Sequence, residues 1–455
     1  MGTVALSRAL LLIGVLAPAA SFGGQAREAL QRAAALVEAG RLQEADREAR
    51  QALSDPATRA AACSVLGAIR LRQDRLAEGV KLLQEAIRLE PRLVGAQLNL
   101  AEGLLLLATD YLKRGEKSSA RALVEDSKRL PDVPLAWSVS FAEVLVRGGL
   151  VAEGIDVLER ARKTDPASYE LAFALGGAYV VKGDPTRALE AYDAALVAKP
   201  ASVTALRQAA IVAEKQGELE RSLSYWMRAR KLAAADPEIL LGFGRVCLKM
   251  DLLDDAEGAL VEAAGQKPGE PAYQYTLAVA KVGKRQYEAA QALLEPLVKQ
   301  MPGDAQLQYA LGSVLYMQGL LPDAAARLQE SLRLDAEQLA SPYYLALVAR
   351  DQGRDAEAIE GLEKLLVRYP DHAASCEALG GLLMNVRRYD EAERLLRKAV
   401  ALNPKSVKGN YQLGLLLART GRREEADKQL AMAKSLREED DKTSRLQLRL
   451  LDPEG

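Results

Sequence analysis

Few side chains in this sequence could do chemistry, and the first to consider is its only histidine. His372 directly follows Asp371, so a Ser-His-Asp or Cys-His nucleophile system would have to use this one imidazole. The chain has no GxxxxGK[ST] phosphate loop, no GxSxG nucleophile turn and no HExxH zinc motif. We therefore interpret His372 as a residue of an exposed turn and predict that the chain is not an enzyme.

The three cysteines are the other side chains with intrinsic reactivity. Cys63, Cys247 and Cys376 lie far apart, and no pair has the spacing of a metal site or of a redox CxxC motif. Each falls at an apolar position of a predicted helix. We predict that all three are small buried hydrophobic residues, and we expect no metal and no cofactor.

The overall charge excludes one large class of partner. The chain has 61 Lys and Arg residues against 62 Asp and Glu residues, for a net charge of −1. A nucleic-acid or anionic-membrane binder needs a concentrated basic surface, and we expect neither partner. Apolar residues make up 49% of the chain but aromatic residues only 5%, a composition that favours closely packed helices rich in Ala, Leu and Val.

The elements that must position His372 and the three cysteines are repeats of 34 positions. Steps of 34 back from Ala392, in the stretch 373–406, reach Ala358, Ala324, Ala290 and Ala256. Within each step, two stretches of helical periodicity are separated by a glycine or another turn residue, which predicts a helical hairpin.

Two further positions recur in phase. Good N-cap residues precede the first helix of several repeats: Ser168, Ser202, Asp236, Asp304 and Ser406. Large residues recur in the second helix, where we expect them to fill the space between successive hairpins: Tyr192, Trp226, Leu260, Leu294, Leu328, Leu362 and Leu396.

Leu379-Gly380 in the first helix, followed by Ala392, Ala399 and Pro404, resembles the signature of the tetratricopeptide repeat. The resemblance covers about twelve units and implies an all-α, right-handed superhelical solenoid of antiparallel helix-turn-helix hairpins. The third unit is longer than the period by six residues, counted from Pro91 to Pro131, and we place the excess in its first helix. The expected units are 26–59, 60–93, 94–134, 135–168, 169–202, 203–236, 237–270, 271–304, 305–338, 339–372, 373–406 and 407–440.

The N-terminus has the layout of a secretory signal peptide. Arg8 precedes the short apolar run Ala9–Leu16, and small residues follow at Ala17, Ala19 and Ala20. We expect a signal peptide over 1–20, the repeat array over 21–440 and a tail over 441–455. The protein is then exported, periplasmic or secreted, and associates with a membrane only if the segment stays uncleaved.

The resemblance also implies that residues five, nine and twelve of each unit line a concave groove. Tyrosine combines a large apolar ring with a hydroxyl, which suits a peptide-binding surface. A tyrosine at position five could instead pack on the neighbouring first helix, and both interpretations stay open at this point. The candidate peptide-binding residues are Phe173, Arg207, Leu241, Arg245, Tyr275, Tyr309, Tyr316, Tyr343, Arg350, Glu377 and Tyr411.

The sequence therefore predicts a non-enzymatic scaffold that binds a protein or peptide segment, in envelope or secretion-system assembly. Two alternatives remain. The array could self-associate as a structural protein, giving a homo-oligomer, or it could supply substrate recognition to an enzyme on another chain.

Overall fold

The chain folds into paired antiparallel helices, as the repeats predict. The computed structural model describes residues 24–130 and 133–451, with the backbone alone for 439–451, and no strand occurs among them. In most hairpins the two helices pack mainly against each other, so the predicted all-α solenoid of about twelve hairpins is confirmed. The predicted signal peptide lies outside the described residues.

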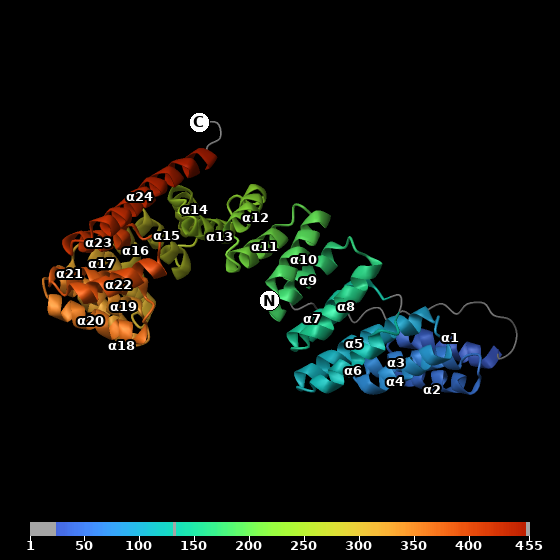
Figure 1. Ribbon diagram of the computed structural model, residues 1–455. Helices are drawn as coiled ribbons and strands as arrows, with labels where there is room; N and C mark the ends of the chain where they lie inside the picture. The colour runs from blue at the N-terminus through green and yellow to red at the C-terminus, as the bar shows by residue number, and fades with distance from the viewer. Residues whose placement is uncertain (1–23, 131–132, 452–455) are drawn as a thin grey trace. The chain divides into compact units, whose positions relative to one another are not determined.

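The helices group into two compact units, Met1–Leu232 and Ala233–Gly455. From here on, "first unit" and "second unit" mean these two groups, and a single repeat is called a hairpin. The helices of the first unit, coloured blue to green in Figure 1, are α1 (Gly24–Glu38), α2 (Leu42–Gln51), α3 (Arg59–Arg72), α4 (Leu76–Leu89), α5 (Val94–Lys113), α6 (Lys117–Ser127), α7 (Leu135–Arg147), α8 (Val151–Thr164), α9 (Tyr169–Lys182), α10 (Pro185–Ala198), α11 (Val203–Lys215) and α12 (Leu219–Leu232), with a short 3₁₀ turn at Ala52–Ser54.

The second unit continues the same alternation of first and second helices. Its helices, green to red in Figure 1, are α13 (Pro237–Lys249), α14 (Leu253–Gln266), α15 (Pro271–Gly283), α16 (Tyr287–Gln300), α17 (Ala305–Met317), α18 (Leu321–Leu334), α19 (Ala340–Asp351), α20 (Asp355–Arg368), α21 (Ala373–Asn385), α22 (Tyr389–Leu402), α23 (Val407–Arg419) and α24 (Arg423–Leu451).

Close packing inside each hairpin depends on small residues facing large ones. A Cβ added to Gly176 on α9 would lie 2.5 Å from the Tyr192 ring on α10, and one added to Gly380 on α21 would lie 2.7 Å from Leu396 on α22. We expected these large residues to fill the space between successive hairpins, and that expectation is wrong for Tyr192 and Leu396. They lie between the two helices of one hairpin, because the glycine lets the second helix approach closely.

The turn inside each hairpin requires one residue with a left-handed backbone. Eight glycines supply it, among them Gly149, Gly183 and Gly353. Four described hairpins place Asp74, Asp251, Arg285 or Arg387 there, at φ between 57° and 64°. This conformation costs a non-glycine residue about 1–2 kcal/mol, so the packing of the two helices must dictate the turn.

The helix starts follow the predicted capping pattern. Ser168, Ser202 and Ser406 each accept a hydrogen bond from a backbone N–H in the first turn of the helix that follows. Asp236 and Asp304 do the same for α13 and α17. These caps satisfy N–H groups that have no partner within the helix.

The lengthened hairpin has its additional residues in α5, which is 20 residues long. The left-handed turn residues Asp74 and Gly115 are seven positions further apart than the period, one more than the proline spacing suggested. All three cysteines are buried on first helices, as predicted, at 4% exposure or less. None of the described helices has the length and apolar character that crossing a bilayer requires.

Candidate binding surface

The predicted binding residues are distributed over both units. Phe173 and Arg207 lie on α9 and α11 of the Met1–Leu232 unit, and the other nine lie on first helices of the Ala233–Gly455 unit. Five of these nine are tyrosines, on α15, α17, α19 and α23. We call them the tyrosine face: Tyr275, Tyr309, Tyr316, Tyr343 and Tyr411.

One tyrosine that the repeat phase did not select joins three members of this face. Tyr344 lies on α19, and its ring centroid is 5.8 Å from that of Tyr309, 5.5 Å from that of Tyr316 and 5.5 Å from that of Tyr343, each edge to face. Edge-to-face packing at this range is favourable for aromatic rings. The four rings therefore form one cluster, which we call the aromatic cluster, across α17 and α19.

A charged pair is attached to the cluster at Tyr316. The Tyr316 hydroxyl donates to Asp351 Oδ2 at 2.7 Å, and Arg350 Nη2 donates to the same hydroxyl at 3.1 Å. Arg350 Nε also donates to Asp351 Oδ1 at 2.7 Å. The three side chains satisfy one another, so the predicted groove residue Arg350 is already neutralised by its neighbour.

The ionisation of this cluster follows from its burial. Burial raises the pKa of Tyr309 to about 12, with Tyr344 and Tyr275 adding to the shift. Burial also raises the pKa of Tyr316 to about 12, and its hydrogen bond to Asp351 adds to the effect. For Asp351, burial opposes ionisation, but bonds from Arg350 and Tyr316 outweigh it and lower the pKa. At neutral pH the tyrosines are therefore protonated and Asp351 is charged.

The remaining tyrosines differ in exposure. Tyr275 is half-buried, and Gln306 Nε2 donates to its hydroxyl at 3.0 Å. Tyr309 and Tyr343 are also half-buried, whereas Tyr411 is 51% exposed. The packing interpretation therefore describes Tyr309 and Tyr343, whose rings contact Tyr344, and peptide binding along the ladder stays a prediction.

Glu377 interrupts the tyrosines at position five, and its carboxylate is already occupied. Ser406 donates to its Oε2 at 2.7 Å, and Lys408 Nζ lies 2.9 Å from its Oε1. The Glu377 side chain is only 16% exposed. A basic ligand residue would have to displace Lys408 to reach it.

Four further predicted residues lie on α9, α11 and α13. Phe173 is stacked on Tyr169 at 5.7 Å and tilted against Tyr192 at 5.6 Å, so it packs with its own hairpin. Arg207 and Leu241 are half-buried, and Arg245 is exposed.

His372 is not the exposed turn residue that its sequence position suggested. It is half-buried, its ring centroid lies 5.5 Å from that of Tyr343, and its Nδ1 is 2.6 Å from Ser375 Oγ. Burial lowers its pKa. It occupies the N-cap position of α21 without capping it, because the ring turns toward the tyrosine on the preceding first helix.

Sequence reasoning missed Tyr344 and Asp351 because it followed only positions five, nine and twelve. The adjacent pair Tyr343-Tyr344 is the one signal that was available, since neighbouring residues on a helix point in different directions. Among the described residues, no group of three or more His, Cys, Asp or Glu side chains could hold a metal ion.

Four stretches of the chain match a known repeat family. The family described as tetratricopeptide repeat matches residues 139–203, 275–338, 321–373 and 377–435. The chain contains tetratricopeptide repeats. Arrays of such repeats present extended concave binding surfaces, so the protein-interaction scaffold predicted from the sequence fits them. No curated protein matches the sequence.

Several solved structures resemble the chain in fold. A tetratricopeptide repeat protein from Parabacteroides merdae ATCC 43184 is 18% identical over 55% of this chain and 98% of its own, with a TM-score of 0.45. The Cut9–Hcn1 hetero-tetramer of the APC/C is 14% identical over 90% of this chain and 81% of its own, with a TM-score of 0.45. Yeast Tom70 is 13% identical over 94% of this chain and 99% of its own, with a TM-score of 0.39. Similarity at this level says nothing about the partners of this chain.

Proposed function

We propose that the chain is an exported, non-enzymatic scaffold that binds an extended, uncharged segment of a partner protein along the tyrosine face. The observation that carries this proposal is the aromatic cluster, whose four rings connect α17 to α19. Aromatic side chains bury a large area with little loss of conformational freedom, which makes them good binding anchors.

The charges beside the tyrosine face support an uncharged ligand. Arg350 is paired with Asp351, and Glu377 is paired with Lys408. A charged ligand residue would have to break one of these pairs and would gain little net energy in exchange. An extended segment could instead place apolar side chains on the rings and backbone carbonyls near tyrosine hydroxyls.

The test compares three forms of the full chain as bait in an envelope fraction. The first is the unaltered chain, the second carries Tyr309→Ala with Tyr343→Ala, and the third carries Tyr309→Phe with Tyr343→Phe. The phenylalanine variant is the matched control, because it keeps the rings and removes only the hydroxyls. We expect one partner to be captured by the unaltered chain and the phenylalanine variant and lost with the alanine variant.

Capture of the same partner at the same yield by all three forms would contradict the tyrosine face as the site. A homo-oligomer in light scattering that none of the substitutions changes would favour the self-associating structural protein instead. Consistent capture of an enzyme would favour the accessory role.

The exported location rests on the N-terminal sequence alone. The apolar run Ala9–Leu16 and the small residues after it are typical of a cleaved signal peptide. Mass spectrometry of the protein isolated from its own cells should find an N-terminus near Ala20. An intact Met1 in a cytosolic fraction would contradict export.

A further inference from the structure

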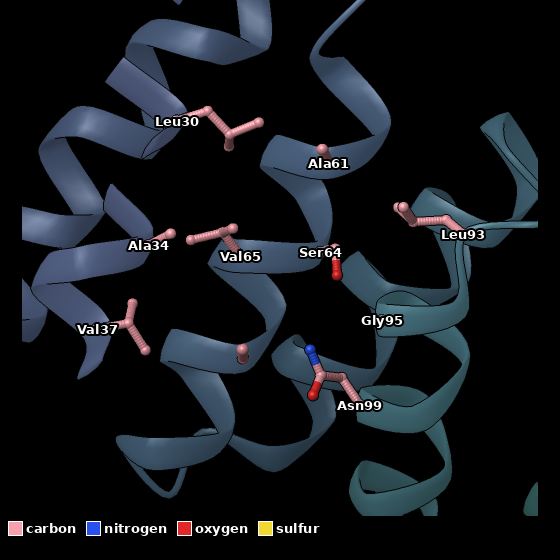
Figure 2. Close-up of a pocket in the computed structure, with 10 residues that line it drawn as sticks. Leu30, Ala34, Val37, Ala61, Ser64, Val65, Leu93, Gly95 and Asn99 are labelled. Carbon is pink, nitrogen blue, oxygen red and sulfur yellow. The ribbon is translucent and has the colours of Figure 1, made fainter. Parts of the chain in front are cut away.

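Two pockets of the described chain differ in size and in the helices that form them. The one drawn in Figure 2, among α1, α3 and the start of α5, has a cavity of about 40 Å³, which has room for water and for no larger ligand. Another, formed by α19, α20 and the end of α18, has a cavity of about 340 Å³. Small-molecule sites typically measure about 300–1,000 Å³, so this pocket, which we call the hairpin pocket, is large enough for an organic ligand.

The hairpin pocket lies on a different face of α19 from the predicted groove. The α19 residues that line it are spaced three and four positions apart, which places them on one face of the helix: Pro342, Leu345, Ala346 and Ala349. Tyr343 and Arg350, at the groove positions of the same helix, are not part of this lining. The hairpin pocket is therefore separate from the tyrosine face.

The pocket exists because side chains that fill the same space in the neighbouring hairpins are missing here. Ala349 stands where α17 has Leu315 and α21 has Leu383, 34 positions away on either side, and both leucines are buried. Gly361 on α20 likewise has no side chain, whereas its counterparts 34 positions away are Arg327 and Leu395. Two truncations that face each other across one hairpin leave a cavity that the helices have not closed.

Leu345 shows the effect of the missing side chains. Its counterparts Leu311 and Leu379 are each 2% exposed, whereas Leu345 is only partly buried. Apolar surface that faces a cavity or water is unfavourable in proportion to its area. An apolar ligand that covered Leu345 would recover the burial that the other hairpins obtain from their own leucines.

The cations at one end of the pocket fit a single carboxylate. Lys364 and Arg368 lie one turn apart on α20, and both line the pocket. Arg368 is already occupied, because its Nη1 donates to the Ala336 carbonyl at 3.0 Å and its guanidinium pairs with Glu337. Lys364 Nζ lies 2.6 Å from Glu360 Oε1, and both of these side chains are more than half exposed. Such a surface pair is weak, so a ligand carboxylate can replace Glu360 at little cost.

The other end of the pocket disfavours a second anionic group. Glu357 lines it seven residues before Lys364, about 10 Å away along the helix at 1.5 Å per residue. Arg354 pairs with Glu357 but does not line the pocket, so a ligand at this end meets the carboxylate. An aliphatic chain of about eight carbons spans the distance between the two ends at ordinary bond lengths.

We propose that the hairpin pocket binds a free aliphatic monocarboxylate of about eight carbons. Its chain lies against Leu345, Ala349 and Gly361, and its carboxylate pairs with Lys364. The site does not depend on the tyrosine face. It gives the second unit a small-molecule site in addition to the protein-binding surface proposed above.

The first test measures binding of octanoate to the full chain by calorimetry, at concentrations below those at which octanoate forms micelles. Octanedioate is the matched probe, because it has the same chain length and a second carboxylate. The methyl NMR signals of Leu332, Leu345 and Leu365, which line the pocket, show where the probe binds. We expect octanoate to shift these signals and to bind about tenfold more tightly than octanedioate, whose second carboxylate meets Glu357.

The second test fills the pocket from within. Gly361→Leu supplies the side chain that Leu395 supplies in the next hairpin, so it should abolish octanoate binding. Gly361→Ala is the matched control, because it gains the same helix preference over glycine without filling the cavity. We expect Gly361→Leu to melt at a higher temperature than Gly361→Ala, since only the leucine buries its side chain in the pocket.

The third test removes the proposed cation. Lys364→Gln should weaken octanoate binding about fivefold, as expected for the loss of one partly solvated ion pair. Lys398→Gln is the matched control, because Lys398 occupies the same repeat position on α22, where Leu395 replaces the glycine. Its affinity for octanoate should equal that of the unaltered chain.

Any of four results would overturn the proposal. Octanoate leaves the three methyl signals unchanged, or octanedioate shifts them equally. Gly361→Leu melts below Gly361→Ala, which would show that the cavity has no room for a side chain. Lys364→Gln and Lys398→Gln bind octanoate with the same affinity. None of these variants changes a residue of the tyrosine face, so the capture experiment stands or fails separately.

Discussion

At the scale of single residues, the surroundings of a side chain decide its role more than its type does. His372 could be placed from the sequence at the start of a first helix, and that position is correct. Its contact with Tyr343 could not be foreseen, because a one-dimensional period does not say which way a ring turns. For the same reason the sequence pointed to Arg350 and Glu377 but not to Asp351 and Lys408, which neutralise them.

The burial of His372 makes stability depend on pH near neutrality. Its pKa is lowered in the folded chain, so the unfolded chain takes up a proton more readily as the pH falls. The contribution of neutral His372 to the free energy of unfolding is therefore fully present above the usual histidine pKa of about 6.5. This contribution is lost as the pH drops below that value. No other histidine exists in the chain, which isolates this contribution from that of the carboxyl groups titrating at lower pH.

We expect the urea midpoint of the second unit to decrease between pH 7.0 and pH 5.5 in the unaltered chain. His372→Asn removes the imidazole but keeps a polar side chain at the N-cap, so its midpoint should decrease less over the same range. Amide NMR signals of α19 to α22 report the midpoint of this unit, because both tryptophans, Trp137 and Trp226, lie in the first unit. An equal decrease in both proteins would show that His372 titrates as it does in the unfolded chain.

At the scale of the helical hairpin, the sequence was a good guide. The 34-residue period located the helices, the capping residues and the left-handed turns, because these depend on local backbone chemistry. It misjudged where Tyr192 and Leu396 pack, since small and large residues in phase do not reveal whether their partner lies in the same hairpin or the next. The tyrosine face was found only in part, because Tyr344 lies outside the three groove positions.

Two helical glycines provide a matched test of hairpin packing. A Cβ on Gly380 would lie 2.7 Å from Leu396, whereas a Cβ on Gly361 would meet only Ala346 Cβ, at an ordinary 3.5 Å. Gly380→Val should therefore lower the free energy of unfolding by about 1–3 kcal/mol. Gly361→Ala should raise it by about 1 kcal/mol, because alanine is the better helix former. Chemical denaturation measures both, and a destabilised Gly361→Ala would show that the α20 backbone needs glycine.

At the scale of the whole molecule, the repeats make each hairpin depend mainly on its neighbours. Described helices pack on the next element or on the one after it, so contacts are local along the chain. The division into Met1–Leu232 and Ala233–Gly455 has no counterpart in the 34-residue period, which continues through both residues. A repeat pattern specifies what each hairpin looks like and does not specify how the hairpins group into compact units.

Local contacts predict local consequences of damage. In such an array stability is approximately a sum of the stabilities of single repeats and of the interfaces between neighbours. Gly380→Val should therefore accelerate amide hydrogen exchange in α21 and α22 most, and in the adjoining helices α19, α20, α23 and α24 to a smaller extent. Exchange in α1 to α12 should stay unchanged, and Gly176→Val in α9 should give the converse pattern. Uniform acceleration along the whole chain after either substitution would mean that both units unfold as a single cooperative structure, which local stacking alone cannot produce.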